Sequence, residues 1–190
     1  VDGNSIILSI DMTIQSIAEK YLEEACIDNS CTDGGNIVIM NPKNGDILAM
    51  ATYPDYDLND PFNIEATGFA DIWDTLSQEE KNNAYYTLWR NKNVSDLYEP
   101  GSTFKMLSAL AGLDSKVITT TEKIKANGKY EYANHPMCWV YSYYGRTHGW
   151  VNVSDAIKVS CNCFFYEVGR RMGIDNLVKY CQMFGLGNKT

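Results

Sequence analysis

The chain has 190 residues and a mass of 21.4 kDa, enough for one ordinary domain with its own hydrophobic core. Its 16 basic and 24 acidic residues give a formal net charge of −8, which disfavours binding to a nucleic-acid backbone. Hydrophobic residues make up 45%, a globular composition, and no apolar run approaches the roughly 18 residues that span a bilayer.

The N-terminal quarter predicts a helix followed by a hairpin. Apolar residues recur at helical spacing over 12–26, and Asp11 or Thr13 can cap this helix. Two short apolar runs, 36–40 and 46–52, flank a turn that contains Pro and Asn-Gly. This pattern is typical of an antiparallel β-hairpin.

The middle of the chain is less regular. Residues 53–98 contain scattered Pro, Asn, Asp and aromatic residues, which predicts a long excursion with short helices. Helical spacing returns over 102–113, and the polar, aromatic segment 117–150 predicts loops with short strands. Because no internal repeat or linker interrupts the sequence, we expect residues 1–190 to belong to one domain.

Two further helices are expected near the C-terminus. Residues 153–172 predict a helix capped by Ser154, with a break near Ser160, and residues 175–184 predict a short final helix. Helices combined with an antiparallel hairpin indicate an α+β fold.

The string Glu99-Pro-Gly-Ser-Thr-Phe-Lys105 carries the first chemical motif. Ser102 and Lys105 are three residues apart at a helix start, so their side chains share one face. A lysine with a lowered pKa can deprotonate a serine hydroxyl, and a helix N-terminus can stabilise an oxyanion. The bare spacing is weak, since most serines before a helix are only caps.

The surrounding sequence makes the motif more specific. Together, four strings resemble the transpeptidase domain of class B penicillin-binding proteins, the cell-wall cross-linking enzymes, over nearly the whole chain. They are Asn41-Pro-Lys-Asn-Gly-Asp-Ile-Leu-Ala-Met50, Trp89-Arg90-Asn91, Tyr98-Glu-Pro-Gly-Ser-Thr-Phe-Lys105 and Ser160-Cys161-Asn162. The resemblance implies a penicillin-binding, serine β-lactamase-like fold in which helices pack on an antiparallel sheet.

The resemblance also implies roles for four residues. Ser102 would attack the penultimate D-alanine carbonyl of a stem peptide, and Lys105 would be its base. Ser160 would pass a proton to the leaving amine, and Asn162 would hold Lys105 and the substrate amide. An amine from a second stem peptide would then form the cross-link without any cofactor, and a β-lactam would stall at the acyl stage.

One expected motif is missing. The family's Lys-[Ser/Thr]-Gly strand does not occur, and Lys189-Thr190 does not stand for it. We therefore expect the N-terminal portion of a transpeptidase domain, a soluble piece that is incomplete at its C-terminus and inactive alone. The parent protein would be extracytoplasmic, held by an N-terminal membrane anchor outside this chain, and associated with the cell-wall synthesis machinery.

Other functions remain open at this point. A serine β-lactamase of the same fold would add rapid deacylation, and a β-lactam sensor domain would acylate without cross-linking. A non-catalytic metal-binding fragment is the third alternative.

The six cysteines raise the question of a metal. Their spacing matches no standard zinc module and favours buried thiols, whereas the resemblance favours metal, because clostridial class B members can carry zinc beside the Ser-x-Asn motif. The expected ligands are Cys138 (or Cys161), His148, Asp155 and Cys163. Cys161 and Cys163 would point apart in a regular helix, so only one is expected to bind, and Cys163 is preferred.

Overall fold

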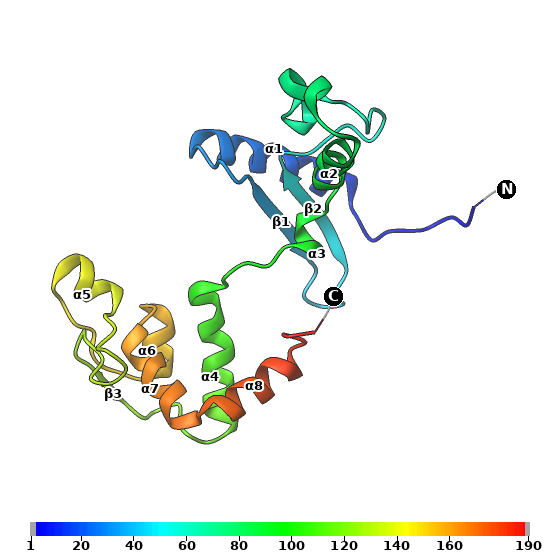
Figure 1. Cartoon of the computed structure of the whole chain (residues 1–190). Coiled ribbons are helices and arrows are strands. Elements are labelled where there is room, and N and C mark those ends of the chain that lie inside the picture. Colours follow the sequence, from blue (N-terminus) through cyan, green and yellow to red (C-terminus); the bar gives the residue numbers. More distant parts are fainter. Residues whose placement is uncertain (1–2, 189–190) are drawn as a thin grey trace. The chain divides into compact units, whose positions relative to one another are not determined.

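The computed structural model describes residues 3–188, whose contacts divide the chain into two compact units, residues 1–97 and 98–190 (Figure 1). Each unit is described here by itself. Lys189 and Thr190, which were set aside as a false third motif, lie outside the described residues. The assignment of 1–190 to a single domain stays a prediction.

The first unit is built on the predicted helix and hairpin. Helix α1 (Met12–Asp28) packs against an antiparallel pair, β1 (Gly35–Met40) and β2 (Ile47–Tyr53). The Asp11 carboxylate accepts the backbone N–H of Thr13 at 2.9 Å, so the predicted cap is confirmed. The core between helix and hairpin consists of small and medium side chains, Ala18, Leu22, Cys26, Ala49 and Ala51.

The rest of this unit is mostly irregular, as expected, with one longer helix. Its 3₁₀ and α segments are Glu65–Thr67, Ala70–Thr75, α2 (Gln78–Leu88) and α3 (Lys92–Ser95). Helix α2 has 11 residues and begins with a capping box between Ser77 and Glu80. Aromatic rings from α2 and the preceding loop, Phe62, Tyr85 and Trp89, pack edge-to-face or stacked.

The second unit is mainly helical and carries a short antiparallel pair. Its elements in chain order are the 3₁₀ turn Gly101–Thr103, α4 (Phe104–Asp114), β3 (Ile124–Ala126), α5 (Trp139–Tyr144), β4 (Gly149–Val151), α6 (Val153–Lys158), α7 (Asn162–Met172) and α8 (Ile174–Met183). Helix α5 was not predicted. The cap of α6 is Asn152, whose side chain accepts the N–H of Asp155 at 2.9 Å, and the prediction of Ser154 was wrong.

Helix α7 lies at the centre of the core of this unit. Phe164 and Val168 are fully buried, and α4 packs against α7 (Figure 1). A Cβ on Gly112 of α4 would lie 2.8 Å from Cγ1 of Val168, so the close approach of these helices requires glycine. Helices combined with antiparallel pairs confirm the α+β class. In residues 3–188 no helix is long and apolar enough to cross a membrane.

Candidate active site

Ser102 lies in the 3₁₀ turn that leads into α4. Gly101 before it has φ +56°, a left-handed conformation that glycine adopts without strain. The Thr103 hydroxyl donates to the Pro100 carbonyl at 2.6 Å and fixes the turn. Ser102 itself is exposed, so its hydroxyl faces solvent at a helix entrance.

Lys105 joins both sequence motifs. Its Nζ lies 3.2 Å from the Ser102 Oγ and 2.9 Å from the Ser160 Oγ. It donates to the backbone carbonyl of Ser160 at 2.9 Å and to the Asn162 Oδ1 at 2.5 Å. The Ser160 hydroxyl donates to the Ser102 Oγ at 2.9 Å, which closes a ring of two hydroxyls and one amine. All four residues predicted as catalytic are therefore brought together.

A sharp break between two helices positions Ser160 and Asn162. Ser160 has φ +49°, an uncommon conformation for a residue with a Cβ, and lies between α6 and α7. The Cys161 N–H donates to the Ala156 carbonyl at 2.9 Å, and the indole of Trp139 donates to the Val159 carbonyl at 3.0 Å. The predicted break near Ser160 is confirmed, and backbone strain at this position is held by hydrogen bonds on both sides.

The surroundings of Lys105 favour its neutral form. Burial lowers the pKa of the Lys105 ammonium, and the thiols of Cys138 and Cys161 oppose this in part. A neutral amine has two N–H donors and one lone pair. The two carbonyl oxygens from Ser160 and Asn162 can take the donors, which leaves the lone pair for a serine hydroxyl.

A cluster of metal-binding side chains lies directly behind the Ser160 break. The ligand atoms of Cys138, His148 and Cys161 all lie within 4.8 Å of one another, and both thiols are fully buried. The Cys138 Sγ is 3.6 Å from the His148 Nδ1, close to the separation of about 3.6 Å that tetrahedral zinc imposes on sulfur and nitrogen ligands. Two thiols and one imidazole also suit zinc chemically, so these residues fit three of the four positions of a tetrahedral zinc site.

The predicted ligand set agrees only in part. Cys138 and His148 belong to the cluster, but Cys161, not the preferred Cys163, supplies the second thiol. Cys163 is buried beside the cluster, and Asp155 is used in the cap of α6. The break at Ser160 was expected, but the sequence did not indicate which of the two cysteines after it would lie beside His148.

Burial disfavours the charged forms of several side chains in and beside this cluster. Burial raises the pKa of the Cys161 thiol to about 12 and also raises that of Cys163. Burial and then the Lys105 charge lower the pKa of His148. The Asn162 N–H donates to the Cys138 Sγ at 3.3 Å, which ties the cluster directly to the Ser-x-Asn motif.

Comparison with known sequences gives one family. Residues 35–190 match the family model of the penicillin binding protein transpeptidase domain. Stage V sporulation protein D of Bacillus subtilis is 32% identical over 191 residues, covering 100% of this chain and 26% of the relative. The peptidoglycan D,D-transpeptidase MrdA of Acinetobacter baumannii is 29% identical over 194 residues, with 99% and 25% covered. The chain therefore spans about a quarter of the length of these relatives.

Comparison with solved structures agrees. Penicillin-binding protein A of Mycobacterium tuberculosis, solved as a penicillin G acyl-enzyme complex, superposes with a TM-score of 0.68 at 27% identity. The match covers 95% of this chain and 40% of that one.

Proposed function

Because the chain belongs to the transpeptidase-domain family of class B penicillin-binding proteins, we propose that it supplies the acylation residues of a peptidoglycan D,D-transpeptidase. The observation that carries this proposal is the position of the Lys105 Nζ, within hydrogen-bond reach of Ser102, Ser160 and Asn162. A nucleophile next to a base, with that base oriented by further groups, is the arrangement that covalent catalysis requires.

In the first step the lone pair of neutral Lys105 takes the proton of Ser102. The serine Oγ attacks the carbonyl carbon of the penultimate D-alanine, and an oxyanion develops on the carbonyl oxygen. The backbone N–H of Ser102 is the donor that this chain offers to the oxyanion. The lowered pKa of Lys105 favours this step, since more of the amine is unprotonated at neutral pH.

Collapse of the tetrahedral intermediate needs a proton on the leaving amine. The hydroxyl of Ser160 contacts both Ser102 and Lys105, so it can pass the proton from the lysine to the amine of the departing D-alanine. Asn162 holds the lysine through its Oδ1. The acyl group on Ser102 is then taken by an amine of a second stem peptide, which regenerates the serine and makes the cross-link.

A third element of the family's site is absent from the printed sequence. No Lys-[Ser/Thr]-Gly occurs in the 190 residues, and loss of one oxyanion donor costs roughly 10²–10³ in rate. We therefore expect these 190 residues alone to acylate very slowly and to associate through exposed strand edges. Stoichiometric acylation of the isolated, monomeric chain within minutes would contradict this expectation.

The proposed metal is a structural zinc ion held by Cys138, His148 and Cys161. When bound, zinc would take the thiols as thiolates and fix the segment that carries Ser160 and Asn162 through metal–ligand bonds. Acyl transfer itself needs no cofactor.

The proposed cellular location of the parent protein follows from the proposed substrate. Stem peptides of the cell wall lie outside the cytoplasmic membrane, so we place the parent protein there, membrane-anchored and working with the cell-wall synthesis machinery. β-Lactams, which imitate the D-alanyl-D-alanine end, are the expected inhibitors, as the acyl-enzyme of the M. tuberculosis relative illustrates.

The test uses the parent protein and a fluorescent penicillin. Wild-type protein should be labelled, Ser102→Ala should lose the label completely, and Ser108→Ala should keep it. Ser108 is a matched control because it lies on the same helix and bonds only to the Phe104 carbonyl. Unchanged labelling of Ser102→Ala would overturn the proposal, and rapid turnover of a chromogenic cephalosporin would favour a β-lactamase instead.

A further inference from the structure

A polar cavity of about 280 Å³ lies in the second unit, apart from the Ser102 site. Its walls are formed by β3, β4, the segment that follows β3 and one face of α7, and none of the four candidate catalytic residues lines it. Five basic and two acidic side chains line the cavity, so its lining carries a net charge of +3 in a chain whose net charge is −8. This local reversal of charge requires an explanation.

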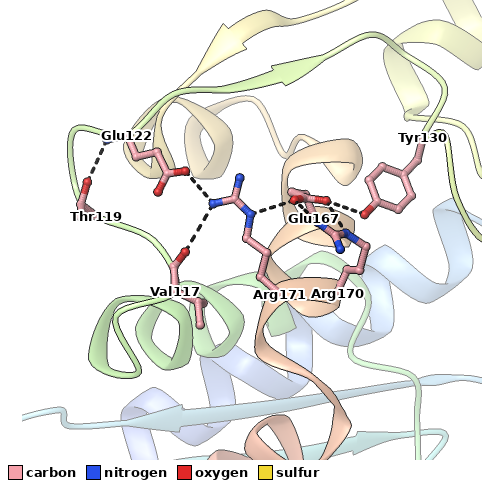
Figure 2. Close-up of polar contacts among 7 residues, drawn as sticks. All are labelled: Val117, Thr119, Glu122, Tyr130, Glu167, Arg170 and Arg171. Carbon is pink, nitrogen blue, oxygen red and sulfur yellow. Dashed lines mark hydrogen bonds and ion pairs between the residues drawn. The ribbon is translucent and has the colours of Figure 1, made fainter.

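On one side the charges are already neutralised within the protein (Figure 2). Glu167 accepts hydrogen bonds from the guanidinium groups of Arg170 at 2.8 and 2.9 Å and of Arg171 at 2.7 Å. Its carboxylate also accepts the Tyr130 hydroxyl at 2.7 Å, and Arg171 forms a second ion pair with Glu122 at 2.6 Å. These arginines are structural, and they form a fixed wall.

On the other side three ammonium groups have no such partner. Lys123, Lys125 and Lys129 are exposed, and no carboxylate of the described residues lies within 4.0 Å of their Nζ atoms. Lys129 lies over the ring of Tyr141, 5.3 Å from its centroid. The alternation along β3 explains why Lys123 and Lys125 share one exposed face, because Ile124 between them is buried. Against these three lysines the lining has only one other carboxylate, Glu131, so a net positive charge remains that attracts an anion.

An exposed tryptophan, Trp150, lines the cavity together with these lysines. It is directly opposite Lys125 in the β3–β4 pair and leaves 62% of its surface exposed. The face of an indole is a large apolar surface, and the C–H face of a pyranose ring is a flat apolar surface that can stack on it. A ligand that combines a sugar ring with a negative group would use both features.

We propose that this cavity binds an anionic saccharide, a pyranose that carries a phosphate or carboxylate group. The ring stacks on Trp150, and the charged group lies between Lys123 and Lys125, with Lys129 adding to the local field. The volume is near the lower end of the roughly 300–1,000 Å³ typical of ligand pockets, which limits the occupant to about one sugar unit. The proposal does not depend on acyl transfer, and its test uses no catalytic readout.

Isothermal titration calorimetry of the 190-residue chain at low salt tests the proposal directly. Glucose 6-phosphate and glucuronate are the two charged probes, which separate phosphate from carboxylate sources, and glucose and inorganic phosphate are controls for the ring and the charge. At least one charged sugar should bind with roughly millimolar affinity, as expected for one small ligand with few contacts. Binding should weaken at least fivefold in 0.5 M salt.

Variants locate the site. Lys125→Glu should weaken binding at least tenfold, whereas Lys179→Glu, the same charge change on the exposed face of α8, should alter it less than twofold. Trp150→Ala should weaken binding of the charged sugar at least fivefold and leave the response to inorganic phosphate unchanged. If neither charged sugar shows saturable binding, the proposal is overturned. Equal affinity for glucose or inorganic phosphate, or equal effects of the two lysine variants, would also overturn it.

Discussion

The two compact units differ in the residues that form their hydrophobic cores. In the first unit a small core of alanines, Leu22 and Cys26 lies between α1 and the hairpin. In the second unit Phe164, Val168 and two buried thiols support the break at Ser160, and all four candidate catalytic residues lie in front of them. The larger cavity, about 790 Å³, belongs to the first unit and contains none of these four residues. The volume of a cavity therefore does not identify the candidate catalytic site in this protein. Proximity to the packed core around α7 identifies it better.

The largest expected effect concerns the base. Lys105→Ala in the parent protein should lower the second-order rate of penicillin acylation by about 10³, within the roughly 10²–10⁴ attributed to general bases. Lys158→Ala, an exposed lysine at the end of α6, should leave the rate within twofold. Because the active form of Lys105 is unprotonated, the wild-type rate should also rise with pH through its lowered pKa. Equal rates for the two variants would remove Lys105 from the mechanism.

Substitutions that truncate core side chains should affect acylation differently in the two units. Phe164→Ala should cost about 3–5 kcal/mol of unfolding free energy and also reduce acylation, since Phe164 is fully buried in the core cluster that contains Cys161, the residue between Ser160 and Asn162. Leu22→Ala should cost about 2–5 kcal/mol, because it empties the core under the hairpin. Acylation should stay within threefold in Leu22→Ala at temperatures where the protein is folded. Denaturant melts and acylation rates measure both effects, and equal loss of acylation in the two variants would contradict the separation.

Much of this organisation is predictable from the sequence, and the failures have physical causes. Helix α1, its Asp11 cap and the hairpin follow from strong periodicity and turn residues. Helix α5 was missed because Trp139–Tyr144 has only six residues, mostly aromatic, and shows no apolar period. The cap at Asn152 could have been found, since Asp155 three residues later completes a capping box.

In the candidate site, too, some features were predictable from the sequence and others were not. Ser102, Lys105, Ser160 and Asn162 were identified through the family resemblance of the surrounding strings, because the bare spacings alone are weak signals. The choice between Cys161 and Cys163 depended on the backbone at Ser160, whose positive φ no residue type announces. Long-range proximity of Cys138 and His148 to that break also depends on tertiary packing.

Removal of the proposed zinc should affect only the second unit. Protein purified without added metal should contain close to one equivalent of zinc, and chelation should lower the melting temperature of this unit by about 10–20 °C. This value assumes a free zinc concentration about 100-fold above Kd, which stabilises the fold by about 2.7 kcal/mol, and a domain of fewer than 100 residues. Cys161→Ser should lose the metal and Cys181→Ser, a partly buried cysteine outside the cluster, should retain it. Less than a tenth of an equivalent in the wild-type protein would make these residues ordinary buried groups.

The smallest expected effect is a pH dependence. Hydrogen bonds from Arg170, then from Arg171 and Tyr130, hold the pKa of Glu167 at about 2, against about 4.3 in the unfolded chain. A depressed pKa stabilises the fold above the unfolded value, and the stabilisation is lost as pH falls from about 4.3 toward 2. Wild-type protein should therefore melt a few degrees above Glu167→Gln at pH 6, and this difference should shrink at pH 3. A difference that does not change with pH would show that the carboxylate charge is not responsible.

The most direct test of the central claim is peptide mass spectrometry of the parent protein after reaction with a β-lactam. The account predicts one adduct per molecule, on the peptide that contains Ser102, and none on the peptide that contains Ser160. An adduct on Ser160 would contradict the assignment of nucleophile and proton carrier, although both hydroxyls lie within reach of the same lysine.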